Sequence, residues 1–176
     1  MERVVIIGPS CSGKTTMARR VAAILQAPHI ELDAIHWLPG WQERDDDEFR
    51  ELTQAAVVAD RWVVDGNYAM VRDIVWPRAT TVVWLNYSFP VVLWRAFRRT
   101  LIRSVGRQTI FSENKETIRR SFFSRESILL WVFMTYRLRR NQFRAIFDDR
   151  DYPEVEFIEL RNQRDADQFL TSRRDI

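Results

Sequence analysis

Apolar residues along the chain fall into short runs that are separated by longer amphipathic stretches. Most of these runs are rich in valine or isoleucine, a pattern typical of strands that are covered on both faces of a parallel sheet. The runs are RVVIIG (3–8), HIELD (29–33), RWVVDG (61–66), TTVVWLNY (80–87) and VEFIEL (155–160). The pattern therefore predicts a sheet of five strands.

The stretches between the runs carry apolar residues at helical spacing. In the first stretch, Met17, Val21 and Leu25 lie on one stripe of a helix that begins near Lys14. Further helices are expected over 45–59, 90–104, about 124–147 and 165–172. Because strands alternate with helices, the predicted fold class is α/β, with a parallel sheet and right-handed crossovers.

Length and composition indicate one globular domain over 1–176. Apolar residues make up 46% of the chain and charged residues 29%, which is an ordinary balance for a packed core. The longest strongly apolar run, ILLWVFM (128–134), is too short to cross a bilayer, and no targeting segment precedes the first strand. A single cysteine excludes an internal disulfide framework. We therefore expect a cytoplasmic protein without a membrane partner.

The net charge of +3 hides a strong asymmetry. The segment 87–147 contains twelve arginines, one lysine and three acids, so it carries +10 and the rest of the chain −7. Arginine's planar fork suits bidentate contacts with phosphate. Most of these arginines fit a solvated helix face, but their concentration in one segment also suits an anionic ligand.

The strongest motif follows the first strand. GPSCSGKT (8–15) matches G-x-x-x-x-G-K-[ST], a loop whose backbone N–H groups surround phosphates between a strand and a helix. Lys14 is expected to reach the β- and γ-phosphates, and the Thr15 hydroxyl to ligate Mg²⁺. The motif therefore predicts a site for a nucleoside triphosphate. Its expected residues are Gly8, Pro9, Ser10, Cys11, Ser12, Gly13, Lys14, Thr15 and Thr16.

Two aspartates end predicted strands at the edge where such a site would lie. Asp65 is the expected acid for magnesium, although a turn aspartate before glycine is the alternative. Asp33 is expected to orient or deprotonate an acceptor hydroxyl, or to hold Mg²⁺ through water. His36 and Trp37 follow Asp33, and they either line an acceptor pocket or pack beneath a loop. The acceptor region is expected at about 33–60.

Arginines also recur where a closing lid is expected, at about 105–125. Arginines that close over the γ-phosphoryl group would stabilise the charge of the transition state. The candidates for this role are Arg99, Arg103, Arg119, Arg120 and Arg125. On the long helix that follows, Arg137, Arg140 and Arg144 share one face.

Together these segments resemble the adenylate-kinase and shikimate-kinase group of P-loop kinases. The resemblance is closer to the adenylate-kinase-related proteins labelled DNA topology modulation proteins, and it covers nearly the whole chain. The segments that carry it are ELDAIHWLPGW, RWVVDGNY, VVWLNYS, LWRAFRRTL and LRNQRDADQFL.

The resemblance implies a three-layer fold with strand order 2-3-1-4-5, an arginine-rich helical lid, ATP as the donor and Mg²⁺ assisted by Asp65. It also implies an adenine-contacting loop after the fifth strand, formed by Arg161, Asn162 and Gln163. Adenylate kinases carry an arginine soon after the corresponding "DG", whereas this chain reads DGNYAMVR. Arg72 is the candidate to replace that arginine in binding the acceptor.

Two functions from different classes follow. The first is a Mg²⁺-assisted kinase that moves the γ-phosphoryl group of ATP to a small-molecule or nucleotide acceptor. The second is a nucleotide-gated regulator that binds nucleic acid, with weak ATPase activity. Its electrostatic attraction would come from the +10 segment and its base stacking from Trp131, Phe133 or Tyr136. Against this function, those aromatic residues lie in an apolar helical pattern, which favours a place in the core.

Overall fold

The computed structural model describes residues 1–106, 109–110, 114–115, 128–149 and 152–173, with side chains except at 103–131 and 148–149. Its centre is a fully parallel sheet in the order β2-β5-β1-β6-β9. Counted along the chain, this is the predicted order 2-3-1-4-5. The strands are β1 (Arg3–Ile7), β2 (His29–Glu31), β5 (Trp62–Asp65), β6 (Thr81–Leu85) and β9 (Glu156–Leu160).

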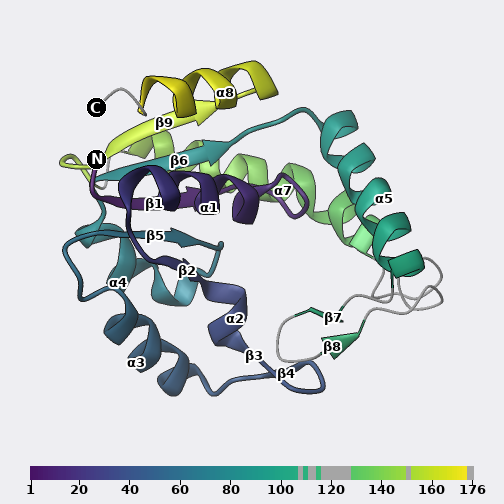
Figure 1. Cartoon of the computed structure of the whole chain (residues 1–176), viewed down its shortest axis with the longest axis horizontal. Helices are drawn as coiled ribbons and strands as arrows, with labels where there is room; N and C mark the ends of the chain where they lie inside the picture. Colours follow the sequence, from purple (N-terminus) through teal and green to yellow (C-terminus); the bar gives the residue numbers. More distant parts are fainter. Residues whose placement is uncertain (107–108, 111–113, 116–127, 150–151, 174–176) are drawn as a thin grey trace.

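Helices cover both faces of this sheet, so the predicted three layers are confirmed (Figure 1). Helices α1 (Lys14–Leu25) and α8 (Gln163–Ser172) pack on one face. On the other face lie α3 (Asp46–Ala56), α4 (Arg72–Val75) and much of α7 (Ile128–Asp149). Helix α5 (Phe89–Gly106) packs against α7 beyond the end of the sheet.

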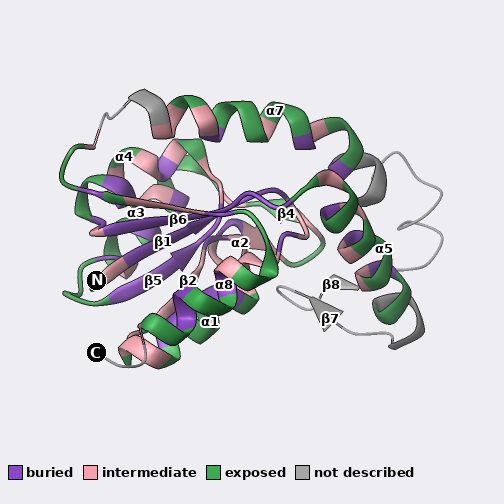
Figure 2. Ribbon diagram, turned by 90° about the horizontal axis from the view of Figure 1, so that it is seen from above, coloured by how far each residue is buried: buried purple, intermediate pink, exposed green. Residues whose placement is uncertain are grey.

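The unbroken apolar runs are explained by burial on both faces. In β1, Val4 and Ile6 belong to the core beneath α1 and α8, while Val5 and Ile7 belong to the core on the opposite face. All four side chains are at most 1% exposed, and the central strands β1, β5 and β6 form the buried part of the sheet in Figure 2, while the edge strands β2 and β9 are less buried. Burying each such side chain stabilises the fold by about 1.5–3 kcal/mol.

One predicted strand is shorter than the sequence suggests. The strand expected over 29–33 ends at Glu31, because Leu32 begins a short helix, α2 (Leu32–His36). Asp33 therefore lies in the first turn of a helix and does not end a strand. A small antiparallel pair, β3 (Trp37–Leu38) and β4 (Gln42–Glu43), follows α2 and was not predicted.

The remaining elements are short, and two of them, β7 and β8, lie within the predicted lid. Two 3₁₀ turns flank α4, and β7 pairs with β8 in antiparallel fashion. Most of the predicted lid at 105–125 lies outside the described residues, so that expectation stays a prediction. Within the described part of the chain, no helix is both long and apolar enough to span a bilayer. The remaining bounds are Ala69–Val71 (η1), Trp76–Arg78 (η2), Thr109–Ile110 (β7) and Asn114–Lys115 (β8).

Candidate active site

The loop between β1 and α1 requires glycine at its first position. Gly8 has φ +154°, and a Cβ atom there would lie 2.8 Å from Ser12 Oγ and 3.0 Å from the Leu85 carbonyl oxygen. Within the loop, the Ser12 N–H donates to the Pro9 carbonyl at 3.2 Å. Gly13, with φ +96°, is the N-cap residue that precedes α1. The motif is thus folded into a tight turn that ends at a helix N-terminus.

This helix N-terminus is suited to an anion. No side chain caps α1, and its first turn contains no acidic residue. Lys14 Nζ donates to the Pro9 carbonyl at 3.4 Å, so the ammonium group lies over the loop. Burial lowers the pKa of Lys14, while the carboxylates of Asp33 and Asp65 oppose that shift. Unpaired N–H groups, the helix dipole and one ammonium group therefore converge on the loop.

Two carboxylates meet the Thr15 hydroxyl at the edge of the sheet. Thr15 Oγ1 lies 2.7 Å from Asp65 Oδ2 and 3.0 Å from Glu31 Oε1. Glu31 and Asp65 are register partners of β2 and β5, so the sheet itself places them side by side. Asp65 is only 3% exposed, and its Oδ1 atom lies 3.0 Å from His29 Nε2. Asp65 therefore lies beside Thr15 at the end of β5, and its role toward Mg²⁺ stays a prediction.

This cluster fits a magnesium ion. Thr15 has one hydroxyl proton but two carboxylate partners, so it cannot donate to both at once. Burial and the Asp65 carboxylate raise the pKa of Glu31, which means that the ionised pair is unfavourable without a cation. Hydroxyl and carboxylate oxygens are donors that Mg²⁺ prefers. No group of three or more His, Cys, Asp or Glu within the described ranges is arranged to hold a metal by itself.

Asn67 fastens the phosphate loop to the end of β5. Its Nδ2 atom donates to the Gly8 carbonyl at 2.6 Å, and its Oδ1 atom accepts from the Gly8 N–H at 3.3 Å. Gly66 precedes it with φ +145°, and a Cβ atom there would lie 2.8 Å from Leu32 Cβ. The segment after Asp65 therefore holds both the loop and the start of α2 in place.

The acceptor side is formed by α2, β3 and the segment after β5. The Tyr68 hydroxyl donates to Asp33 Oδ1 at 2.8 Å, and burial, followed by the Asp33 charge, raises the pKa of Tyr68 above its usual range. His36 is 6% exposed, and its ring packs against Trp37, Phe49 and Tyr68 at centroid distances of 4.6–5.0 Å. Of the two interpretations of His36, this packing favours an aromatic support beneath the site.

Arg72 lies farther along the same segment, at the start of α4. Its guanidinium carbon lies 5.1 Å from the centroid of the Trp76 ring. It also lines a cavity of about 10 Å³, which is roughly the room needed for one water molecule. Its predicted contact with an acceptor stays a prediction.

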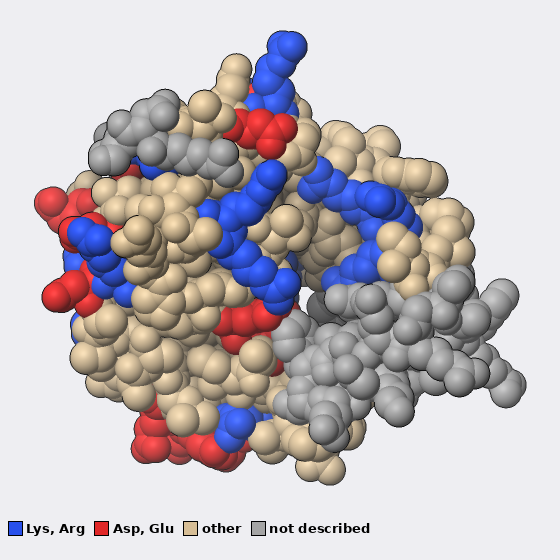
Figure 3. Space-filling model, viewed as in Figure 1, with Lys and Arg blue, Asp and Glu red and all other residues tan. Residues whose placement is uncertain are grey.

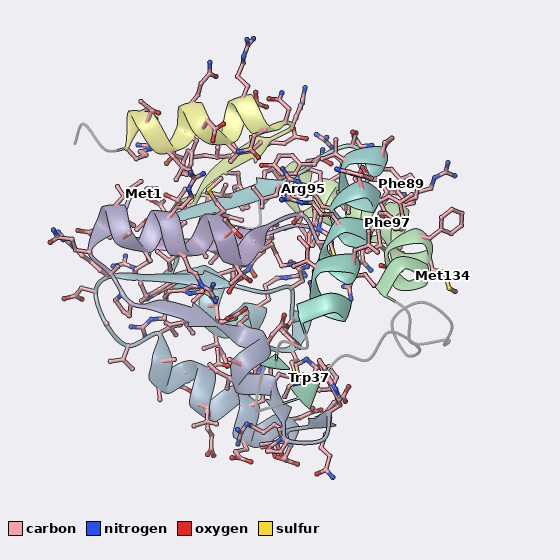
Figure 4. The ribbon with its side chains drawn as sticks, turned by 45° about the vertical axis from the view of Figure 1, so that its right-hand side comes forward. Met1, Trp37, Phe89, Arg95, Phe97 and Met134 are labelled. Atoms are coloured by element: carbon pink, nitrogen blue, oxygen red, sulfur yellow. The ribbon has the colours of Figure 1, made fainter. Side chains whose placement is uncertain are left out.

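Arg95 joins the phosphate loop to the loop after β9. Its Nη1 atom donates to the Ser12 carbonyl at 2.6 Å, its Nη2 atom donates to Gln163 Oε1 at 2.8 Å, and its guanidinium lies 4.4 Å from the Tyr87 ring centroid. One helical turn later, Arg99 Nη1 lies 3.7 Å from Cys11 Sγ. In Figure 4, Arg95 extends from α5 toward α1, and basic side chains border a hollow beside α5 in Figure 3.

The loop after β9 is also ordered by local contacts. Asn162 Oδ1 accepts from the Asp165 N–H at 3.0 Å and caps α8, while the Arg161 N–H donates to Asp165 Oδ2 at 2.8 Å. Gln163 faces Arg95, but the Arg161 side chain pairs with Glu159 at 2.9 Å. The structure thus brings Gln163 close to the phosphate loop and directs the Arg161 side chain toward Glu159.

Of the five arginines predicted for the lid, four have side chains outside the described part of the structure. They are Arg103, Arg119, Arg120 and Arg125. Arg99 is the fifth, and it lies at the phosphate loop.

Glu31, Asn67, Tyr68 and Arg95 contact the predicted site residues but were not singled out as site residues. Signals for two of them were present in the sequence. Glu31 is the last residue of a strand that runs beside β5, and Arg95 begins the Arg95, Arg99, Arg103 stripe. The contacts of Asn67 and Tyr68 depend on the irregular chain path after Gly66.

Comparisons with known proteins support the fold. No protein-family model and no curated protein sequence matches the chain, so the resemblance to DNA topology modulation proteins stays a prediction. The chain is similar to the unliganded crystal structure of a sugar kinase from Janibacter sp. HTCC2649. The TM-score is 0.51 and the identity 18%, over 98% of this chain and 91% of that one. A gluconokinase from Sinorhizobium meliloti 1021 aligns with a TM-score of 0.49 and 18% identity, over 99% and 94% of the two chains. With its phosphate loop and strand order, the chain has the α/β fold of P-loop kinases.

Proposed function

We propose that the protein is an ATP-dependent phosphotransferase that moves the γ-phosphoryl group of ATP to a hydroxyl group of a small molecule or nucleotide. One observation carries this proposal. Lys14 and Thr15 lie at the uncapped N-terminus of α1, and the Thr15 hydroxyl meets the carboxylates of Glu31 and Asp65. A structural turn would need neither the ammonium group nor the paired acids.

The phosphate loop binds the donor. Backbone N–H groups and the dipole of α1 attract the phosphates of ATP, and Lys14 neutralises charge that develops on the moving phosphoryl group. Arg99 lies near enough to the loop, at 3.7 Å from Cys11 Sγ, to assist from the side of α5. Gln163, held by Arg95, provides polar atoms for the nucleoside end of ATP.

Thr15, Asp65 and Glu31 would hold Mg²⁺. When bound, the ion supplies charge neutralisation of the phosphates during phosphoryl transfer. His29 lies 3.0 Å from Asp65 Oδ1 and orients that carboxylate. The pairing of β2 with β5 holds the two acids side by side.

Asp33 is the candidate base for the acceptor. The Tyr68 hydroxyl donates to one of its oxygens at 2.8 Å, and because the pKa of Tyr68 is raised, the phenol stays protonated and fixes the carboxylate. An acceptor hydroxyl hydrogen-bonded to Asp33 would transfer its proton as its oxygen attacks the γ-phosphorus. The sugar-kinase neighbour makes polyols a class to test first.

A panel of acceptors incubated with γ-labelled ATP tests the proposal. We expect label to move to at least one hydroxyl compound in the presence of Mg²⁺, and Asp33→Asn to lower that transfer by about 10²–10⁴-fold. The matched control is Arg98→Ala, an exposed residue on α5 that should leave transfer unchanged. If no polyol, nucleoside or nucleotide accepts label while ATP binds normally, the phosphotransferase assignment is wrong.

A further inference from the structure

A second cavity lies on the side of α5 that faces α7, away from the phosphate loop. Its volume is about 560 Å³, and it is open to solvent, because the side chains of Ser88, Arg137, Arg140 and Arg161 on its wall are exposed. None of its lining residues belongs to the phosphate loop. Phe89, at the start of α5, lies against α7, whereas Arg95 extends to the opposite side (Figure 4). Its polar lining includes Asn86, Ser88, Arg137, Arg140 and Arg161.

The cavity is strongly cationic. Among the residues whose side chains the structure describes, three arginines and no acidic residue line it. Arg137 and Arg140 are three residues apart on α7, so both lie on one face of the helix. Neither has an ion-pair partner among the residues that the structure describes, which leaves two guanidinium groups without a counter-charge at one wall.

The carboxylate of Glu159, which pairs with the lining residue Arg161, is already neutralised. Glu159 accepts from Arg144 Nη2 and Arg161 Nη2, each at 2.9 Å, and also from Asn86. Burial alone would raise the pKa of Glu159, but the hydrogen bonds from Arg161 and Asn86 and the nearby arginine charges lower it. Glu159 is therefore ionised and matched by Arg144 and Arg161, and it does not cancel the charge of Arg137 and Arg140.

Two further features suit a ligand that has an anionic group and an uncharged portion. Helix α5 starts at Phe89 and is 18 residues long, so the positive end of its dipole lies at the cavity together with Ser88. Phe89 and Tyr136 meet edge to face at 5.2 Å, and the Tyr136 hydroxyl donates to the Tyr87 carbonyl at 2.8 Å. This fixed aromatic wall can contact the uncharged part of a ligand.

We propose that this cavity binds a small phosphate monoester, with its phosphate held by Arg137, Arg140 and the N-terminus of α5. The guanidinium groups of Arg137 and Arg140, which form no ion pair with a described residue, match the charge of a phosphate dianion, and their planar forks match its oxygens. The cavity is larger than a phosphate group alone, and its aromatic wall accommodates the rest of the molecule. The site is separate from the phosphate loop and does not depend on the reaction proposed there.

Titration calorimetry with glycerol 3-phosphate tests this site, with glycerol as the uncharged control. The titrations use full-length Lys14→Ala protein, so that the phosphate loop does not contribute. We expect saturable binding that weakens by at least about tenfold in Arg137→Gln/Arg140→Gln, since two charge-assisted hydrogen-bonding groups are lost. Arg139→Gln is the matched control, because Arg139 lies on the same helix, bonds Gln142 and does not line the cavity. That variant should bind as tightly as its parent.

Three results would overturn the proposal: no binding of glycerol 3-phosphate, equal weakening by Arg139→Gln, or unchanged binding in the double glutamine variant. If that variant does not fold, Arg137→Lys/Arg140→Lys keeps the charge but removes the forks, and a several-fold weakening is expected. Competition with a short single-stranded oligonucleotide distinguishes a site for a phosphate monoester from a basic surface that binds nucleic acid. One result would assign these arginines to nucleic acid: the oligonucleotide competes with glycerol 3-phosphate, the competition vanishes with added salt, and Arg139→Gln weakens oligonucleotide binding as much as the double variant does.

Discussion

Arg95→Ala should both destabilise the protein and loosen the phosphate loop. The Arg95 side chain connects three parts of the chain that are distant in sequence: the loop at Ser12, the ring of Tyr87 and the start of α8 at Gln163. Alanine removes all three contacts without placing a new group in the core. The decrease in unfolding free energy and in ATP affinity therefore measures how much this one side chain contributes to the ordering of the site.

The magnitude follows from the contacts. The partly buried hydrogen bond to the Ser12 carbonyl contributes about 1.5 kcal/mol, and the exposed bond to Gln163 about 0.5 kcal/mol. The cation–π contact with Tyr87, at 4.4 Å, adds about 0.5–1 kcal/mol. Water replaces part of these contacts in the variant, so we expect the free energy of unfolding to fall by about 2 kcal/mol. For a chain of this length, the melting temperature would fall by about 4–8 °C.

Urea denaturation of Arg95→Ala and Arg98→Ala, followed by fluorescence, measures this loss. Arg98 is exposed on the same helix, so its variant controls for helix propensity and net charge. Calorimetric titration of both variants with ATP should show weaker binding only for Arg95→Ala, by about tenfold, because the loop must be reordered on binding. Equal unfolding free energies for the two variants, within about 0.5 kcal/mol, would refute the bridging role of Arg95.

Three further changes test the site itself. Lys14→Ala should abolish phosphoryl transfer while leaving the circular dichroism spectrum and melting temperature near those of the parent; normal turnover would remove Lys14 from the mechanism. Asp65→Asn should raise the Mg²⁺ concentration needed for half-maximal transfer by about tenfold or more. If only Asp33→Asn raised that concentration, the roles assigned to the two acids would be reversed. The raised pKa of Glu31 means that its ionised form destabilises the fold, and that this destabilisation grows as the pH rises above the ordinary value of 4.5. Glu31→Gln should therefore raise the urea midpoint at neutral pH, lose that advantage below pH 4.5 and weaken Mg²⁺–ATP binding; a lower midpoint at neutral pH would contradict it.

The fold could be predicted from the sequence because its signals are local and repeated. Each central strand is an apolar run, and each crossover helix has its own stripe of apolar residues at helical spacing. The strands and the α/β class can therefore be predicted from these two patterns. The strand order came from the family resemblance, and the observed pairing agrees with it. The error at Asp33 arose because HIELD continues an extended-looking pattern into α2, and only packing of Leu32 beneath Gly66 shows where the strand ends.

The site was predictable only where a motif fixes the geometry. Gly8 to Thr15 and Asp65 have defined positions relative to a strand end, so their proximity could be expected. Asn67 and Tyr68 reach Gly8 and Asp33 through an irregular segment, and no periodic pattern indicates such contacts. Arg161 illustrates the same limit, because its ion pair with Glu159 depends on the fold of the loop after β9.

We propose that the loop at the start of α1 binds the phosphates of ATP and that Thr15 and Asp65 assist through Mg²⁺. Titration calorimetry of the full-length protein with ATP, with and without Mg²⁺, tests it most directly. We predict one ATP bound per chain, tighter with Mg²⁺, and loss of the Mg²⁺ enhancement in Thr15→Val. ATP binding that is insensitive to Mg²⁺ and to both Lys14→Ala and Thr15→Val, or no binding of ATP at all, would contradict the account.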